Sequence, residues 1–75
     1  METVDLRFAN ALKRLRKAKG LTQESLAQRA GVDYKYLQKL EGSNPSSPTL
    51  ATMKKLSDGL GVSLVELVML LEKPN

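Results

Sequence analysis

The residues best able to make chemical contacts lie in residues 22–41, which read TQESLAQRAGVDYKYLQKLE. The few apolar or small side chains are spaced as in two short helices joined by a turn, and two such helices need a scaffold to pack against. The pattern indicates a helix-turn-helix, whose second helix is built to enter a groove of DNA. The side chains that point away from the leucines of this second helix, and that offer hydrogen-bond donors, are Tyr34, Lys35, Gln38 and Lys39.

The spacing of apolar residues along the rest of the sequence predicts an all-α fold of five helices, with no strand signal. Residues 1–75 are expected to form a single domain, because this length is near the lower limit for a self-sufficient core. Glycines after the first two helices suit left-handed turns. The helices are predicted at about residues 5–19, 22–30, 33–41, 49–60 and 63–72.

The capping residues and inward faces follow from the same pattern. Asp5 is expected to cap the first helix, and Ser63 with Glu66 forms a capping box at the start of the fifth. Gly59 is expected to weaken the fourth helix near its end. The side chains that the fourth helix should direct into the core are Leu50, Met53, Leu56 and Leu60.

The fifth helix carries more apolar side chains than one inward stripe needs. The stripe is complete with Leu64, Leu67, Val68 and Leu71. A small soluble protein rarely leaves a further patch open, so we expect a second copy of the protein to cover it in a homodimer. The alternative is that this helix is buried deeply within the monomer. The surplus residues, assigned to the dimer interface, are Val65, Met69 and Leu70.

The composition argues against several other classes of protein. The sequence has no cysteine and no histidine, which removes disulfides, thiolate metal ligands and the commonest general base. It also lacks clustered carboxylates and a glycine-rich phosphate loop. We therefore expect no enzyme, no metal, no cofactor and no small-molecule ligand. The longest apolar stretch is too short to span a bilayer and no signal peptide is apparent, which predicts a cytoplasmic protein.

The net charge of +4 is concentrated in the first part of the sequence. Residues 1–20 hold six basic and two acidic side chains, a balance of +4, whereas residues 21–75 hold six of each. This asymmetry suits an edge that faces phosphates. The alternatives are a solvated helix face and a membrane-surface helix, the latter disfavoured because the segment lacks a broad apolar face.

Several spaced motifs within residues 8–67 carry a resemblance to a known family. They include LKRLR at 12–16, GLTQE at 20–24, AGV at 30–32, PTL at 48–50 and LGVSL at 60–64. In this order they resemble the Cro/repressor-type helix-turn-helix family, also called the Xre family. The resemblance implies a compact lambda-repressor-like domain whose second and third helices bind double-stranded DNA. It implies a transcriptional regulator that binds a roughly palindromic operator as a homodimer.

The resemblance also assigns roles to single residues. Base contacts are implied for Tyr34, Lys35 and Lys39, with Gln38 close by, and a structural ion pair for Arg16 with Glu41. Tyr36 matches a tyrosine of one subgroup, the controller proteins of restriction–modification systems, although partial packing in the core is the alternative. The residues implied to contact DNA phosphates or the adjoining backbone are Thr22, Gln23, Tyr36, Ser43 and Asn44.

Two other functions remain open from the sequence. An antitoxin-like or other protein-interaction module would use the fifth helix to bind a different protein, with DNA binding secondary. Non-specific nucleic-acid binding would need little more than the basic first helix. The lysines of the third helix argue against protein binding as the whole function.

Overall fold

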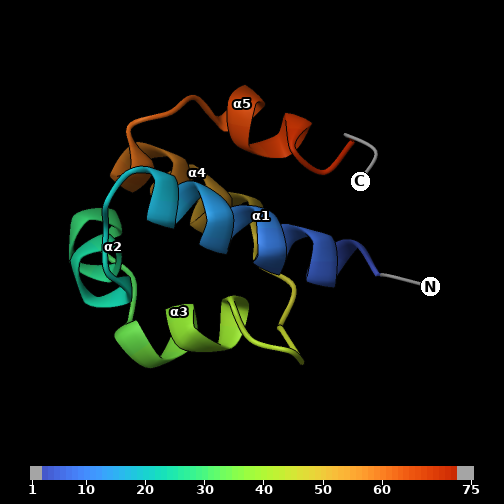
Figure 1. Cartoon of the computed structure of the whole chain (residues 1–75), viewed down its shortest axis with the longest axis horizontal. Coiled ribbons are helices and arrows are strands. Elements are labelled where there is room, and N and C mark those ends of the chain that lie inside the picture. The colour runs from blue at the N-terminus through green and yellow to red at the C-terminus, as the bar shows by residue number, and fades with distance from the viewer. Residues whose placement is uncertain (1–2, 73–75) are drawn as a thin grey trace.

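The computed structural model describes residues 3–72, which form five α-helices and no strand within that range. The prediction of an all-α fold is confirmed. The fifth helix ends earlier than expected, because the amides of residues 70, 71 and 72 bond carbonyls three residues back and so form a tighter turn. The helices are α1 (Val4–Ala18), α2 (Gln23–Ala30), α3 (Tyr34–Leu40), α4 (Leu50–Leu60) and α5 (Leu64–Met69) (Figure 1).

The start of α1 differs from the prediction. Thr3, not Asp5, is the capping residue: its backbone is extended and its Oγ1 accepts a hydrogen bond from the amide of Leu6 at 3.1 Å. Asp5 lies inside the first turn, where its carboxylate accepts a bond of 2.6 Å from the hydroxyl of Ser47. The helix starts earlier because the threonine satisfies an amide that would otherwise lack a partner.

The core is built from leucines contributed by all five helices. Leu50 is a correction to the prediction, because it is 70% exposed as the first residue of α4. It stands at the end of the helix that lies beyond the core, and burial along α4 becomes complete only at Leu56 and Leu60. The leucines without measurable exposure are Leu12, Leu26, Leu37, Leu40, Leu56 and Leu67.

Gly59 has a role in packing that the sequence did not reveal. A Cβ atom added at this position would lie 3.0 Å from both the amide nitrogen and the Cβ of Ala30. The absence of a side chain therefore lets α4 approach α2 closely, and Arg29 Nε donates to the carbonyl of Gly59 at 2.8 Å across the same contact. The cost of a glycine within a helix is offset here by close helix packing.

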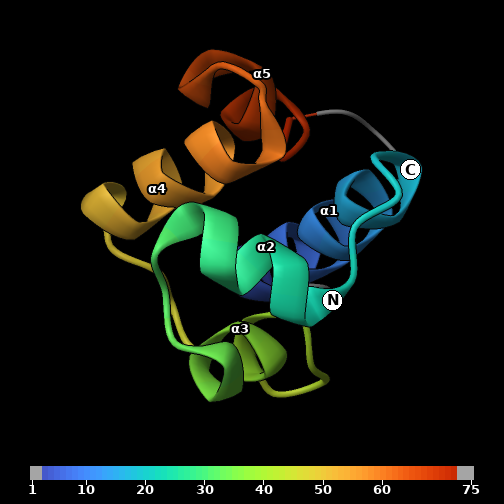
Figure 2. The same ribbon diagram turned by 90° about the vertical axis from the view of Figure 1, so that its left-hand side faces the viewer.

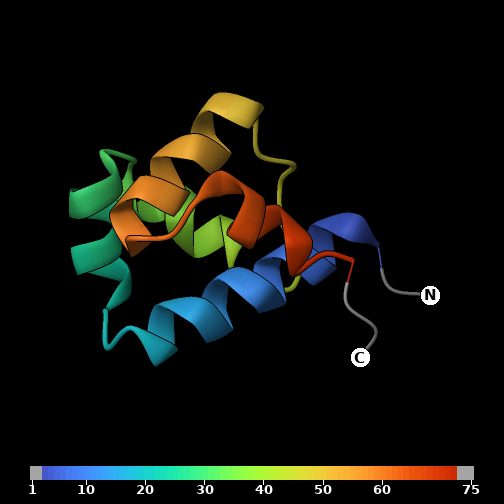
Figure 3. The ribbon, with the colours of Figure 1, turned by 90° about the horizontal axis from the view of Figure 1, so that it is seen from above.

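The helices are arranged so that α3 and α5 lie on opposite sides of the molecule. In Figure 1 α5 is at the top and α3 at the bottom, and the rotated view of Figure 2 keeps them apart in the same way. Seen from above, α5 lies between α1 and α4 (Figure 3). Each of the two outer helices is thus free to present one face away from the core. No helix within the described range is both long and apolar enough to cross a membrane.

Candidate nucleic-acid interface

The turn before α3 sets the angle between α2 and α3. Gly31 has a φ of 71°, in the left-handed region that L side chains rarely adopt, and its amide bonds the carbonyl of Ala27. Asp33 then caps α3 by accepting a hydrogen bond of 3.1 Å from the amide of Tyr36. Leu37 and Leu40 are fully buried, so the rotation of α3 about its own axis is fixed.

The outer face of α3 carries the four predicted base-contacting side chains, all of which are exposed. Tyr34 is 39% exposed, and its hydroxyl accepts a hydrogen bond of 3.1 Å from Gln38 Nε2, which lies one turn further along the helix. Neither Lys35 nor Lys39 forms an ion pair with another residue of the described range. The structure therefore gathers Tyr34, Lys35, Gln38 and Lys39 on one accessible surface, which is called the α3 face below.

Tyr36 lies between this face and the interior. Its side chain is half-buried and packs against the hydrophobic core. The alternative of partial core packing therefore applies to this tyrosine, in contrast to the exposed Tyr34.

The end of α3 is fixed to α1 by a buried ion pair. Arg16 Nε donates to Glu41 Oε2 at 2.7 Å, and Arg16 Nη2 donates to Glu41 Oε1 at 2.9 Å. The carboxylate is 1% exposed, and the third guanidinium bond runs from Nη1 to the carbonyl of Leu21 at 2.7 Å. Two parallel bonds between planar groups define an orientation as well as a distance. One guanidinium thus holds together α1, the turn before α2, and the end of α3.

Gln23, expected at a DNA phosphate, takes part in the same network. Its Nε2 donates to Glu41 Oε1 at 3.1 Å, which leaves the second amide hydrogen and the carbonyl oxygen for another partner. The start of α2 is therefore oriented relative to the end of α3 by the carboxylate of Glu41.

Thr22 is likewise hydrogen-bonded within the protein. Its hydroxyl accepts from the amide of Ser25 at 3.0 Å, and its own amide donates to Ser25 Oγ at 2.9 Å, which completes a capping box. The role of Ser25 was missed from the sequence, although its position three residues after a capping threonine is the signal for it. Ser43 and Asn44 are exposed in the loop that follows α3.

The predicted dimer-forming residues of α5 do not all lie on one surface. Val65 is 67% exposed and Met69 is 56% exposed, but Leu70 is half-buried and packs against the core. Val68, expected to point inward, is exposed instead. The tight turn after Met69 rotates Leu70 towards the core, so the exposed apolar group is Val65, Val68 and Met69.

Comparison with known proteins gives matches along most of the sequence. Residues 12–67 match the family model HTH_3, described as helix-turn-helix. The control protein C.MunI of Mycoplasma sp is 39% identical over 74 residues, which cover 97% of this protein and 99% of that relative.

Two solved structures share the fold. The restriction-modification controller protein C.AhdI from Aeromonas hydrophila is 35% identical, with a TM-score of 0.78, over 84% of this protein and 94% of its own length. The structure of C.Esp1396I bound to a 19 base pair DNA duplex is 28% identical, with a TM-score of 0.85, over 95% of this protein and 93% of that one.

Proposed function

Because this protein belongs to the helix-turn-helix family HTH_3, we propose that it is a sequence-specific DNA-binding transcriptional regulator which inserts α3 into the major groove. The α3 face carries the proposal: donor side chains stand exposed on a helix whose leucines are buried and whose end is locked by the Arg16–Glu41 pair. The similar protein C.Esp1396I has a solved structure with DNA. The protein would act in the cytoplasm, alongside its DNA.

The side chains of the α3 face suit the edges of base pairs. Lys35 and Lys39 donate to the O6 and N7 atoms of guanine, which only the major groove presents in this arrangement. Gln38 offers the paired donor and acceptor that adenine requires. Tyr34 contacts the methyl group of thymine or donates its hydroxyl, and therefore carries less sequence information.

A second set of residues fixes the position of α3 along the duplex. Thr22 and Gln23 stand at the start of α2, where free amides and the positive end of the helix dipole favour a phosphate. Tyr36 lies along the sugar–phosphate backbone, and Ser43 with Asn44 contacts it from the loop after α3. Such contacts fix register without reading sequence.

The exposed group on α5 supports a homodimer. Val65, Val68 and Met69 are exposed apolar side chains of this one helix. In a symmetric dimer each copy places its α3 in a major groove, and the two helices are expected about 34 Å apart, which is one turn of DNA, or a multiple of that distance. The operator is then roughly palindromic, with half-sites at that spacing.

We further propose that the protein regulates a restriction–modification system. C.AhdI is a restriction-modification controller protein, and C.MunI, which matches nearly the whole sequence, is a control protein. Tyr36 also fits the pattern of that subgroup, Asp33-x-x-Tyr36-Leu37.

Selection from a pool of random duplexes tests the proposed function. The protein should enrich a sequence with two-fold symmetry. It should bind this sequence at least about 1,000-fold more tightly than a scrambled duplex of the same length, measured at the same salt concentration. Lys39→Ala should change the enriched sequence, whereas Lys55→Ala, an exposed lysine of α4, should leave it unchanged. Equal affinity for enriched and scrambled duplexes would contradict sequence-specific regulation.

A protein-interaction module is the second candidate, and the exposed apolar group of α5 is the observation in its favour. In that case α5 binds a different protein, such as a toxin, and the purified protein alone sediments as a monomer. Sedimentation of the purified protein as a dimer together with a symmetric enriched sequence would decide for the regulator.

A further inference from the structure

Three cations on α1 have no role in the site described so far. Lys13, Arg14 and Lys17 are exposed, and none forms an ion pair with another residue in the range 3–72. Two other arginines of the same helix are engaged: Arg7 Nη1 donates to the carbonyl of Leu71, and Arg16 to Glu41. The three exposed cations, called the α1 basic edge below, account for much of the positive charge in residues 1–20.

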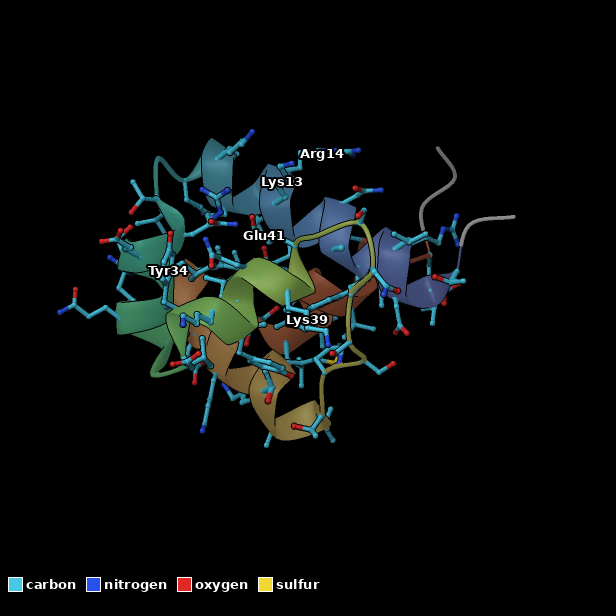
Figure 4. All side chains as sticks on the ribbon, turned by 90° about the horizontal axis from the view of Figure 1, so that it is seen from below. Lys13, Arg14, Tyr34, Lys39 and Glu41 are labelled. Atoms are coloured by element: carbon cyan, nitrogen blue, oxygen red, sulfur yellow. The ribbon has the colours of Figure 1, made fainter. Side chains whose placement is uncertain are left out.

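The basic edge lies beside the end of α3. Lys13 lies three residues before Arg16 and four residues before Lys17, so these side chains are neighbours on the helix surface. Arg16 is bonded to Glu41, directly after the last residue of α3. In the view from below, Lys13 and Arg14 line one edge of the side that α3 presents, and Glu41 lies between them and Lys39 (Figure 4).

The basic edge is also a source of unrelieved repulsion. Lys13 with Lys17 and Arg14 with Lys17 are like charges one turn apart, a spacing at which they destabilise a helix. The carboxylate of Glu41 does not relieve this repulsion, because it is already bonded to Arg16. An anionic partner would remove this repulsion and gain charge-assisted hydrogen bonds.

Resting on the proposed function, we propose that Lys13, Arg14 and Lys17 form a second DNA-binding surface, which binds phosphates that flank the base pairs read by α3. The major groove is about 12 Å wide, so a helix within it has a phosphate backbone close on either side. The ion pair holds α1 to the end of α3, and α1 then passes over one of these backbones. An acidic protein would also match the charge, but continuity with the α3 face favours DNA.

This surface contributes affinity without sequence. Contacts to phosphates release condensed counterions, so each one steepens the dependence of the binding constant on salt. The basic edge therefore strengthens binding to the enriched and scrambled duplexes alike, and leaves the ratio between them unchanged.

A charge-matched pair of double variants tests the proposal. Lys13→Gln with Lys17→Gln removes two charges from the basic edge, and Lys54→Gln with Lys55→Gln removes two from α4. Dissociation constants are measured on the selected and scrambled duplexes from about 50 to 200 mM salt. The α1 variant should flatten the slope of log K against log salt by about 1.8, which is roughly 0.9 for each lost phosphate contact. The α4 variant should keep the slope of the wild type.

Three outcomes overturn the proposal. Equal flattening by both double variants would show a long-range effect of net charge, and an unchanged slope in the α1 variant would leave an acidic protein as the partner of the basic edge. A reduced ratio between the affinities for the selected and scrambled duplexes would mean that the lysines act on base reading. The ratio of the wild-type binding constants for the selected and scrambled duplexes tests the proposed function separately. If that ratio is close to one, the slope of log K against log salt on the scrambled duplex still tests the basic edge.

Discussion

The helices α3 and α5 have similar buried faces but opposite exposed faces. Each is short, with seven and six residues, and each buries leucine completely, Leu37 and Leu40 in α3 and Leu67 in α5. Helices of this length do not form alone in water, so the buried leucines must hold both in place. Outward, α3 presents donors and positive charge, whereas α5 presents valine and methionine. The same anchoring therefore supports two outer faces of different chemistry.

The two helices also differ in how their ends are fixed. The end of α3 is held by a buried, two-bonded ion pair between Arg16 and Glu41. The segment after α5 is held by tight turns, by the packing of Leu70 and Leu71 against the core, and by a bond of 3.1 Å from Arg7 Nη1 to the carbonyl of Leu71. A polar fixture sets orientation more strictly than apolar packing does. This contrast fits the proposed roles, in which the α3 face aligns with base edges and the exposed apolar group of α5 only excludes water.

Removing the polar fixture should have the largest effect. Arg16→Ala leaves the carboxylate of Glu41 buried without its cation, which should lower the free energy of unfolding by about 3–5 kcal/mol. Urea denaturation followed by circular dichroism measures this change. The double variant Arg16→Met with Glu41→Met removes both charges and should recover most of the loss. If the double variant were as unstable as Arg16→Ala, an unpaired charge would not be the cause.

Adding charge to the outer face of α5 should disrupt the proposed dimer. Val65→Asp with Met69→Asp should yield folded monomers, because burial of each of these side chains is worth about 1.5–3 kcal/mol. The dimer dissociation constant should rise by at least roughly 100-fold. Sedimentation over a range of concentrations measures it, and weaker operator binding should follow.

Leu50→Asp provides the matched control for that double variant. Leu50 is 70% exposed, compared with 67% for Val65, and is the first residue of α4. The control should sediment like the wild type. An unchanged dimer in the α5 variant would show that another surface joins the two copies.

Removing one donor from the α3 face should have a smaller and more selective effect. Lys35→Ala should weaken binding to the selected duplex by about 1–3 kcal/mol and relax base preference at one position of each half-site. Binding to duplexes with every base substituted in turn measures this. An equal loss on all of them would show that Lys35 contacts a phosphate and reads no base.

The cap of α5 should give the smallest effect, visible as a dependence on pH. The amide of Ser63 donates to the carboxylate of Glu66 at 3.1 Å, and this bond lowers the pKa of Glu66 below its ordinary value of 4.5. The charged form is favoured in the folded state, so its stabilising contribution is present above pH 4.5 and is lost as the pH falls through the lowered pKa.

Thermal unfolding at several pH values compares the wild type with Glu66→Gln. The wild type should be the more stable of the two above pH 4.5, and the difference should narrow in more acidic buffer. A difference that stays constant with pH would mean that the charge of Glu66 does not contribute to the cap.

The sequence predicted the parts of the fold that depend on neighbours along the backbone. The five helices, the left-handed glycines Gly20 and Gly31, and the Ser63–Glu66 capping box all follow from local rules of spacing and capping. The accessible surface shared by Tyr34, Lys35, Gln38 and Lys39 follows from helical periodicity once Leu37 and Leu40 are buried. These features need no knowledge of distant contacts.

Errors arose where distant contacts decide. Leu50 has the right spacing for the core but stands beyond it, and Leu70 turns inward where the helical pattern placed it outside. Gly59 reads as a weak point until Ala30 is seen against it. Helical periodicity gives the direction in which a side chain points from its helix, but it does not show whether another helix lies in that direction.

By itself, then, the sequence determined which residues could contact a partner, because the outward chemistry of α3 and the positive charge of α1 are local properties. Only the tertiary structure decided how those residues stand relative to one another. The carboxylate of Glu41 receives bonds from Arg16 and Gln23, residues 25 and 18 positions away, and so fixes α1, α2 and α3 in one orientation. Bonds between groups so far apart in the sequence exist only after the helices have packed, because packing alone brings their ends within reach.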